Sequence, residues 1–237
     1  NLENQYRMAG FINSFCEKES LKHFTRDGVF KVLEYSNKIA GSQNKLSTKF
    51  NKIIEILIEA DAWAEYEGNK FINEKNVKKA IVEKRNRSNI IEDRIDELYH
   101  DGKIIIDVKG EHVGKINGLS VLNTGDYVFG RPMVITVSSY AGTKGIINIE
   151  REVELSGNIH DKGVMILEGY LNEKFCKNKP LNITSKICFE QSYSGVDGDS
   201  ASSTELYGIL SSIGNIPIKQ NIAVTGSVNQ KGEIQPV

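Results

Sequence analysis

Cysteine, proline and long apolar runs are scarce in this sequence of 237 residues. The three cysteines, Cys16, Cys176 and Cys188, are odd in number and show no Cys-x-x-Cys spacing. This pattern disfavours a disulfide framework and a zinc site, and it fits a reducing compartment. No apolar run approaches the length of a membrane span, and no signal-peptide pattern opens the chain. We therefore expect a cytoplasmic protein without a metal site and without a membrane partner.

Net charge and a phosphate-binding loop are missing as well. The formal charge of −1 at pH 7 gives no general attraction to nucleic acid or anionic lipid. The pattern Gly-x-x-x-x-Gly-Lys-[Ser/Thr] does not occur, so no segment can cradle nucleotide phosphates in the usual way. Cations do cluster between residues 77 and 87, but acidic residues interleave with or adjoin them and aromatic residues do not. A solvated helix face is the simpler interpretation, and a DNA-binding module is kept only as a third alternative.

Glycine and proline are almost absent from the first hundred residues. Only Gly10, Gly28, Gly41 and Gly68 precede Asp101, and all four prolines follow it. Because these two residue types punctuate strands and turns, the first part should be helical and the second rich in sheet. We predict an α+β chain with a helical bundle over residues 1–87, a connecting helix over 88–101 and a mixed α/β domain over 102–237.

Apolar residues recur at three- and four-residue spacing in the first part, which predicts helices. The stretches are residues 6–15, 29–39, 50–64 and 77–81, followed by a connecting helix near 88–99. Gly41 and Gly68 are expected stop signals, and Asn73 is an expected N-cap. Phe71 and Ile72 form a short strand signal before Asn73.

Short alternating runs in the second part predict strands, with helices between them. The expected strands are residues 104–108, 113–122, 134–140, 145–149 and 186–193, and the expected helices lie near 164–171 and 206–213. His160 falls in the predicted loop before the first of these helices, where a histidine is usually exposed. Its near-neutral pKa suits a general base, but we assign His160 and its neighbour Asp161 only a minor supporting role.

The segment over residues 192–203 joins the last of these strands to the last of these helices. It is an acidic, glycine-rich turn that places Ser200 at the helix entrance. Unpaired amides and the helix dipole favour negative charge there, so a serine hydroxyl could attack a carbonyl beside an oxyanion site. A serine in this position is more commonly a helix cap. A calcium loop is excluded because Gly208 stands where the bidentate glutamate is needed.

Several ordered motifs resemble one family. They are residues 189–193 (Phe-Glu-Gln-Ser-Tyr), 195–203 (Gly-Val-Asp-Gly-Asp-Ser-Ala-Ser-Ser), 130–132 (Gly-Arg-Pro), 148–153, 156–164 and 223–230. Together they resemble the proteolytic domain of Lon proteases, specifically the bacterial LonB-like branch. The order of helices over residues 1–87, with Phe71-Ile72 before Asn73, resembles the lid of an AAA+ ATPase, the module that precedes this domain in the family.

The resemblance implies roles for particular residues. Ser200 would be the nucleophile of a Ser-Lys dyad, with Asp197, Asp199 and Thr225 in support. The family's lysine follows the segment that ends here at Gln235-Pro236-Val237, so we expect it beyond Val237. Lys231, in an expected hairpin turn, and Lys219, in an expected polar connection, are not candidates for the base. In the lid, Lys45 stands in a stretch where the family often has a nucleotide-sensing arginine, and a solvated lysine is an equal interpretation.

The resemblance also implies a function for the whole protein. It would be an ATP-dependent serine endopeptidase, a cytoplasmic hexamer that degrades unfolded polypeptides. ATP and Mg²⁺ would bind an upstream domain, and none of these residues would bind a cofactor. The chain starts at Asn1 rather than Met, so we expect an excised fragment, inactive by itself because the dyad lysine is missing. A non-catalytic assembly or substrate-binding module on the same fold is the alternative.

Overall fold

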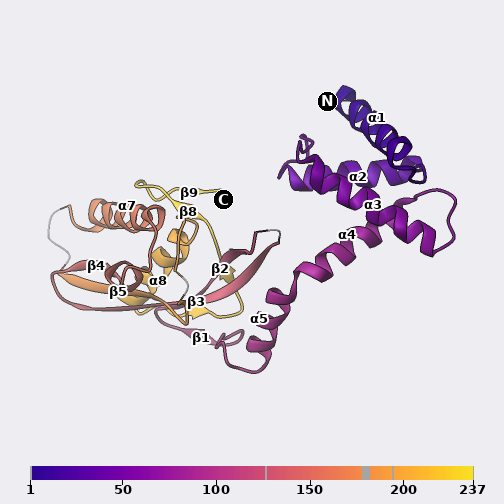
Figure 1. The fold of residues 1–237 in the computed structure, drawn as a ribbon. Coiled ribbons are helices and arrows are strands. Elements are labelled where there is room, and N and C mark those ends of the chain that lie inside the picture. The colour runs from indigo at the N-terminus through magenta and orange to yellow at the C-terminus, as the bar shows by residue number, and fades with distance from the viewer. Residues whose placement is uncertain (1, 126, 178–181, 194, 237) are drawn as a thin grey trace. The chain divides into compact units, whose positions relative to one another are not determined.

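The protein is described here by a computed structural model that covers residues 2–125, 127–177, 182–193 and 195–236. The chain divides into two compact units, Asn1–Ile91 and Glu92–Val237, each described by itself below. The division falls inside the stretch 88–101 that was predicted to connect two domains. Helices dominate the first unit and a sheet with helices forms the second (Figure 1), which confirms the predicted α+β class. Among the described residues, no helix is both long and apolar enough to cross a bilayer.

Four helices build the first unit: α1 (Leu2–Glu19), α2 (Arg26–Ile39), α3 (Phe50–Tyr66) and α4 (Glu74–Ser88). The predicted caps are present. The Asn73 side chain accepts hydrogen bonds from the first-turn amides of α4, and the side chain of Asn76 accepts one from the Asn73 amide. Gly41 and Gly68, with φ of 62° and 68°, follow the ends of α2 and α3 in the left-handed conformation expected of stop signals. The apolar stripes meet in one core that includes Ile12, Val32, Ile53, Leu57 and Val77.

The second unit contains a mixed five-stranded sheet in the order β4-β5-β3-β2-β7. Its strands are β2 (Lys115–Asn123), β3 (Val128–Ala141), β4 (Gly145–Asn148), β5 (Ile183–Phe189) and β7 (Ala223–Val224). Two-residue strands form two further pairs, β1 (Glu111–His112) with β6 (Ile218–Lys219) and β8 (Ser227–Val228) with β9 (Ile234–Gln235). The helices are α5 (Ile90–His100), α6 (Ile149–Glu152), α7 (Asn158–Phe175) and α8 (Ser202–Gly214).

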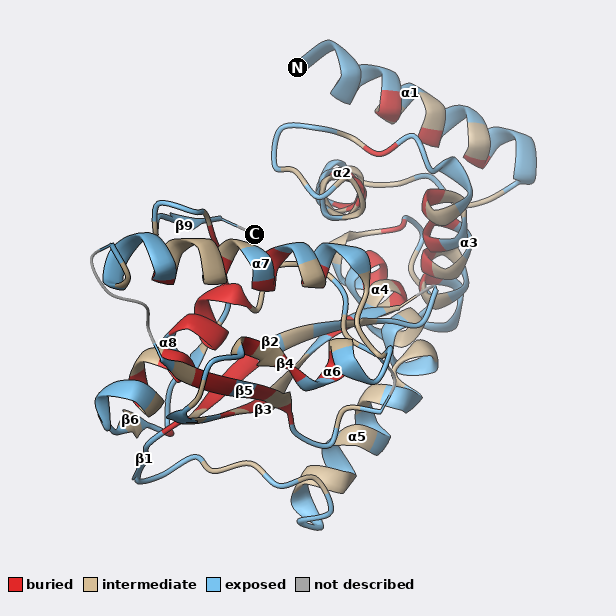
Figure 2. Cartoon of the chain, turned by 90° about the vertical axis from the view of Figure 1, so that its left-hand side faces the viewer, coloured by how far each residue is buried: buried red, intermediate tan, exposed pale blue. Residues whose placement is uncertain are grey.

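Helix α8 is the buried centre of this unit (Figure 2), packed on the sheet and covered by α7. Eight of its residues, from Ser202 to Ser211, are buried. Leu206 and Ile209 join the core formed with Ile135, Ile187 and Leu167. Gly208 permits this packing because it has no Cβ; a Cβ there would lie 2.8 Å from a methyl of Val137. The first turn of α8 is therefore held firmly at the end of the sheet.

Four sequence-based placements are wrong. Residues 104–108 form no strand, because no neighbouring strand pairs with them in the described chain; the amide of Ile105 bonds a side chain instead. Strand β5 ends at Phe189 rather than at residue 193, since Gln191 adopts φ 53° and turns the chain. His160 lies in the first turn of α7, not in a loop, and is buried. Lys219 lies in strand β6 rather than in a connection, although its side chain is exposed as expected.

Candidate functional site

Ser200 lies in the turn between β5 and α8, two residues before the helix begins. Hydrogen bonds join the turn to two segments that are distant in the sequence. Val196 pairs with the segment before α7, donating its amide to Leu155 O (2.9 Å) and accepting from Gly157 N (2.8 Å). The carbonyl of Ser200 accepts from Gly226 N at 2.7 Å and from Thr225 Oγ1 at 3.3 Å. Segments far apart in the sequence thus fix the position of Ser200.

A groove of about 580 Å³ opens beside this turn. Strand β2 forms one wall: β7 pairs only with Asn117 and Gly118, so the following residues of β2 have no partner on that edge within the described chain. Leu119 and Val121 are 43% and 72% exposed there. A strand edge with unpaired backbone groups can accept an extended polypeptide. The lining consists of Leu119, Ser120, Val121, Leu122, Gly130, Arg131, Met133, Phe189, Ser192, Gly195, Val196, Asp197, Ser200, Ala201 and Thr225.

The Ser200 hydroxyl makes no hydrogen bond to any residue that the structure describes, and α8 has no side-chain cap bond at its N-terminus. The helix-cap interpretation of Ser200 therefore finds no support in the geometry. The amides of Ser200 and Ala201 likewise donate to no acceptor within the described part of the chain. Two unpaired amides at the start of a helix form a suitable place for an oxyanion.

The predicted supporting residues surround the same turn. Asp197 and Thr225 both line the groove and are exposed. Asp199 is part of the turn but does not line the groove. Its carbonyl accepts hydrogen bonds from the amide and hydroxyl of Ser202 at 3.0 and 2.7 Å. Gly157 lets Asp197 approach, because a Cβ at residue 157 would lie 2.3 Å from Asp197 Oδ1. The structure thus brings together Ser200, Asp197, Asp199 and Thr225.

Lysines are absent from this groove among the described residues. Lys231 is exposed and forms an ion pair with Glu173, with Nζ 2.7 Å from Oε2. Lys45 is exposed in the loop between α2 and α3, in the first unit. Within the described ranges, no cluster of three His, Cys, Asp or Glu side chains is arranged to hold a metal ion.

His160 has a different environment from the one predicted, because the packing of α7 on α8 buries it. Its side chain is 1% exposed and meets the ring of Phe189 edge-on, with centroids 5.2 Å apart. Asn148, Glu150 and Glu205, each at most 4% exposed, surround it. Asp161, one residue on, accepts a hydrogen bond from Ser156 Oγ at 2.5 Å and lies outside this cluster.

Burial shifts the pKa of His160 and the pKa of Glu205 toward their neutral forms. Desolvation lowers the pKa of His160, against the opposing effect of a hydrogen bond to the Gly198 backbone. Desolvation, with the nearby Glu150 carboxylate as a second cause, raises the pKa of Glu205 to about 8. His160 Nε2 and Glu205 Oε1, 3.5 Å apart, therefore form a neutral contact rather than an ion pair at pH 7. Sequence reasoning missed Glu205, although its spacing of four residues from Ile209 places it on the buried face.

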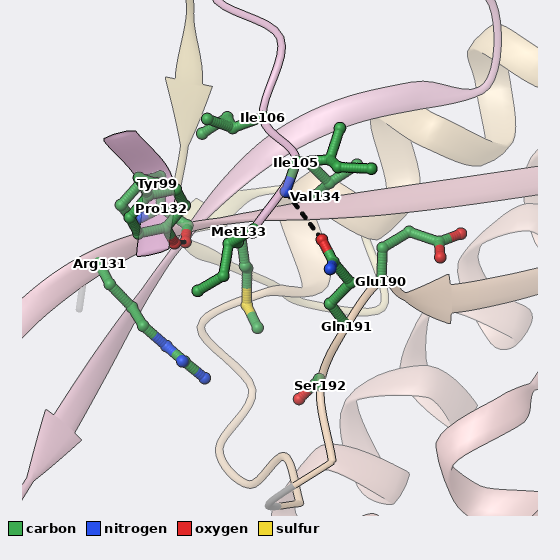
Figure 3. Close-up of a pocket in the computed structure, with 11 residues that line it drawn as sticks. Tyr99, Ile105, Ile106, Arg131, Pro132, Met133, Val134, Glu190, Gln191 and Ser192 are labelled. Atoms are coloured by element: carbon green, nitrogen blue, oxygen red, sulfur yellow. Dashed lines mark hydrogen bonds between the residues drawn. The ribbon is translucent and has the colours of Figure 1, made fainter. Parts of the chain in front are cut away.

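A second contact ties the turn to the segment that follows α5. Gln191 Oε1 accepts from the amide of Ile105 at 2.8 Å, and Gln191 Nε2 donates to Lys103 O at 2.8 Å. Figure 3 shows Gln191 facing Ile105 beside a small pocket, with Arg131 and Ser192 on its wall. Arg131 and Ser192 also line the groove at Ser200. The Gln191 side chain thus gives residues 103–105 the two backbone hydrogen bonds that a strand would have given.

Known proteins resemble both units. Residues 23–87 match the family described as archaeal LonB, AAA+ ATPase lid domain. A putative Lon protease homolog of Escherichia coli K12 is 39% identical over 153 residues, which cover 64% of this chain and 26% of that protein. One from Haemophilus influenzae is 29% identical over 100% of this chain and 39% of its own length. An archaeal Lon protease of Thermococcus kodakarensis is 24% identical over 100% of this chain and 36% of its own length.

The fold and these matches define an AAA+ lid joined to an α/β unit that has a serine-lined groove. The chain is similar to proteins of the Lon protease family over its whole length. It spans less than two fifths of the length of the three relatives named above.

Proposed function

We propose that this chain supplies the lid and most of the proteolytic domain of an ATP-dependent serine endopeptidase. The observation that carries the proposal is the position of Ser200. Its hydroxyl has no partner among the described residues, it lines a groove with an open strand edge, and its own amide and that of Ala201 donate to no described acceptor. Such an arrangement suits attack on a peptide carbonyl, with the oxyanion at the helix N-terminus. An extended, unfolded polypeptide fits the edge of β2 as substrate.

A serine hydroxyl needs a base to become an effective nucleophile. Because no described lysine lines the groove, we propose that the base is a lysine that follows Val237, as the family resemblance implies. Burial beside Ser200 would lower the pKa of such a lysine enough for it to accept the serine proton. Thr225 and Asp197 would then receive hydrogen bonds from the amine when it is protonated. ATP with Mg²⁺ would bind an upstream domain, with Lys45 as a possible contact from the lid, in a cytoplasmic hexamer.

The test of this proposal compares the chain with a longer version that continues with the natural residues after Val237. The substrate is an unfolded casein that carries a fluorogenic label. We expect no cleavage by residues 1–237 and Ser200-dependent cleavage by the longer chain without nucleotide, since peptide chemistry requires the dyad alone. Cleavage by residues 1–237 that Ser200→Ala abolishes would contradict the downstream base. A longer chain that contains the lysine but stays inactive would favour a non-catalytic, substrate-binding module.

Gly157→Ala tests the position of Asp197 in the same assay. The new methyl would lie 2.3 Å from Asp197 Oδ1 and 2.9 Å from Asp197 Cβ. Because rotation of the side chain moves the carboxylate but not Cβ, Asp197 must shift as a whole. The backbone of Gly157, with φ −86° and ψ 161°, accepts alanine without strain. We expect cleavage by the longer chain to fall about tenfold, through the loss of one charged interaction, and the unit to lose some stability because Asp197 must shift. Gly169→Ala, which meets only the mobile end of Gln230, should leave the cleavage rate unchanged.

A further inference from the structure

Arg131 supplies the positive charge of the groove beside Ser200. Among the described residues that line this groove, Arg131 and Asp197 are the charged ones. The Arg131 guanidinium forms no hydrogen bond or ion pair with any described residue, and its Nε is buried without a partner. The Ser192 hydroxyl, on the same groove, is also buried and unpaired. Because a donor cut off from water without an acceptor costs free energy, an acceptor brought to this guanidinium is bound favourably.

Arg131 lies on the face of the sheet that packs against α8. Side chains along a strand alternate between the two faces, so Arg131 shares a face with Met133 and Ile135 of the same strand. Both of these residues pack in the core that contains Leu206 of α8. Figure 3 shows Arg131 and Met133 leaving β3 on the same side. The cation is therefore on the side of the sheet where the turn with Ser200 meets α8.

The open edge of β2 lies one strand away from Arg131. Ser120 of β2 is the direct partner of Arg131, and residues directly opposite each other on paired strands share a face. A polypeptide that pairs with the open edge lies two strand spacings from β3, about 9.6 Å. The intervening residue, Ser120, has a short side chain. An arginine and a glutamate side chain that extend toward each other above Ser120 together span this distance.

We propose that Arg131 is a specificity-determining residue: its guanidinium binds the carboxylate of a glutamate or aspartate side chain in the polypeptide that pairs with β2. The planar guanidinium presents parallel N–H donors that match a carboxylate, and such charge-assisted hydrogen bonds are stronger than neutral ones. The acidic residue is the one that lies beside Ser120. This inference rests on the proposed function, because it assigns the substrate class of the same groove.

Peptide binding to residues 1–237 tests the preference without cleavage. The probes are short fluorescein-labelled peptides of Ser, Thr and Val with blocked ends, and they differ only in one central residue, which is Glu, Gln or Lys. We expect the Glu peptide to bind about tenfold more tightly than the Gln peptide, and the Lys peptide to bind least, as measured by fluorescence anisotropy. High salt should reduce the difference. A Glu peptide that binds no better than the Gln peptide would contradict the proposal.

Substitutions assign the preference to the Arg131 side chain. Arg131→Gln should remove the preference for the Glu peptide, and Arg131→Glu should reverse it in favour of the Lys peptide. Arg131→Lys should keep part of it, since lysine retains the charge but not the planar fork. Arg151→Gln is the matched control, because Arg151 belongs to α6 and does not line the groove. Persistence of the Glu preference in Arg131→Gln would overturn the proposal.

The end of a polypeptide is a second source of carboxylate. A Gln peptide with a free C-terminus, in place of the blocked one, separates the two sources. We expect its affinity to equal that of the blocked Gln peptide, because a polypeptide that pairs along β2 places a side chain, not its end, beside Ser120. If the free C-terminus strengthens binding as much as glutamate does, Arg131 binds chain ends and the proposal is wrong.

Cleavage by the longer chain separates this inference from the proposed function. There kcat/KM for the Glu peptide should exceed that for the Gln peptide about tenfold, and Arg131→Gln should abolish the difference while the Gln peptide is still cleaved. If the peptides bind as expected but no version cleaves them, the substrate preference holds and the peptidase assignment fails. If Ser200-dependent cleavage is present and Arg131→Gln keeps the Glu preference, the role of Arg131 fails alone.

Discussion

Ser200→Ala is expected to lower casein cleavage by the longer chain at least about 10³-fold, because no other described hydroxyl in the groove lies on the residues whose amides are unpaired, Ser200 and Ala201. Residual cleavage would come from the groove and the oxyanion site. Stability should hardly change, since the Ser200 hydroxyl has no partner in the described part of the chain. The rate is measured by fluorescence release, and stability by urea denaturation.

Ser203→Ala is the matched control for that substitution. Ser203 lies in the first turn of α8, is buried, and its hydroxyl also has no hydrogen-bond partner in the structure. Its removal should leave both cleavage and stability close to those of the unmodified chain. If Ser203→Ala abolished cleavage while Ser200→Ala kept it, the nucleophile assignment would be wrong.

Glu205→Gln is expected to stabilise the second unit increasingly as the pH rises. The folded-state pKa of Glu205 is raised from 4.5 to about 8, so the folded state keeps a proton that the unfolded state loses. The stability of the unmodified unit should therefore fall as the pH rises from about 4.5 to about 8, by up to about 5 kcal/mol, and no further above that range. Glutamine is neutral at every pH and therefore removes this pH-dependent loss of stability. Its different hydrogen-bonding groups change the free energy of unfolding by an amount that does not depend on pH.

The measurement is thermal or urea unfolding between pH 5 and pH 9, with circular dichroism for both units. Trp63, the single tryptophan, lies in α3 of the first unit, so its fluorescence reports on the lid alone and should not change. Glu173→Gln is the control: Lys231 lowers the pKa of this exposed carboxyl, so its loss cannot stabilise the unit at high pH. A Glu205→Gln variant with the pH dependence of the unmodified chain would show that Glu205 is charged at pH 7.

Much of the helical unit is predictable because its signals are local. The Asn73 cap, the stop at Gly68 and the apolar stripe of α3 lie within a few residues of the structure that they specify. A strand forms only where another strand pairs with it, so strands were predicted less accurately than helices. Residues 104–108 were predicted as a strand, yet the Ile105 amide donates to the distant side chain of Gln191 and the Asp107 carbonyl accepts from the side chain of Asn117.

The candidate site shows the same division. The turn at residues 195–200 is local, and its motif pointed to Ser200, Asp197 and Asp199 as neighbours. The position of His160 could not be read in this way, because its burial depends on Asn148 and Glu205, 12 and 45 residues away in the sequence. The predicted loop before the helix suggested an exposed histidine, whereas the packing of α7 on α8 placed the ring in the core.

The sequence by itself determined the helices of the lid, the α+β class and the serine at the entrance of a helix, since these depend on spacing and local turn chemistry. Only the tertiary structure decided which polar side chains lie in the core and which strand edge stays open. Those features arise where segments far apart in the chain meet, and their energies depend on burial that no single segment defines.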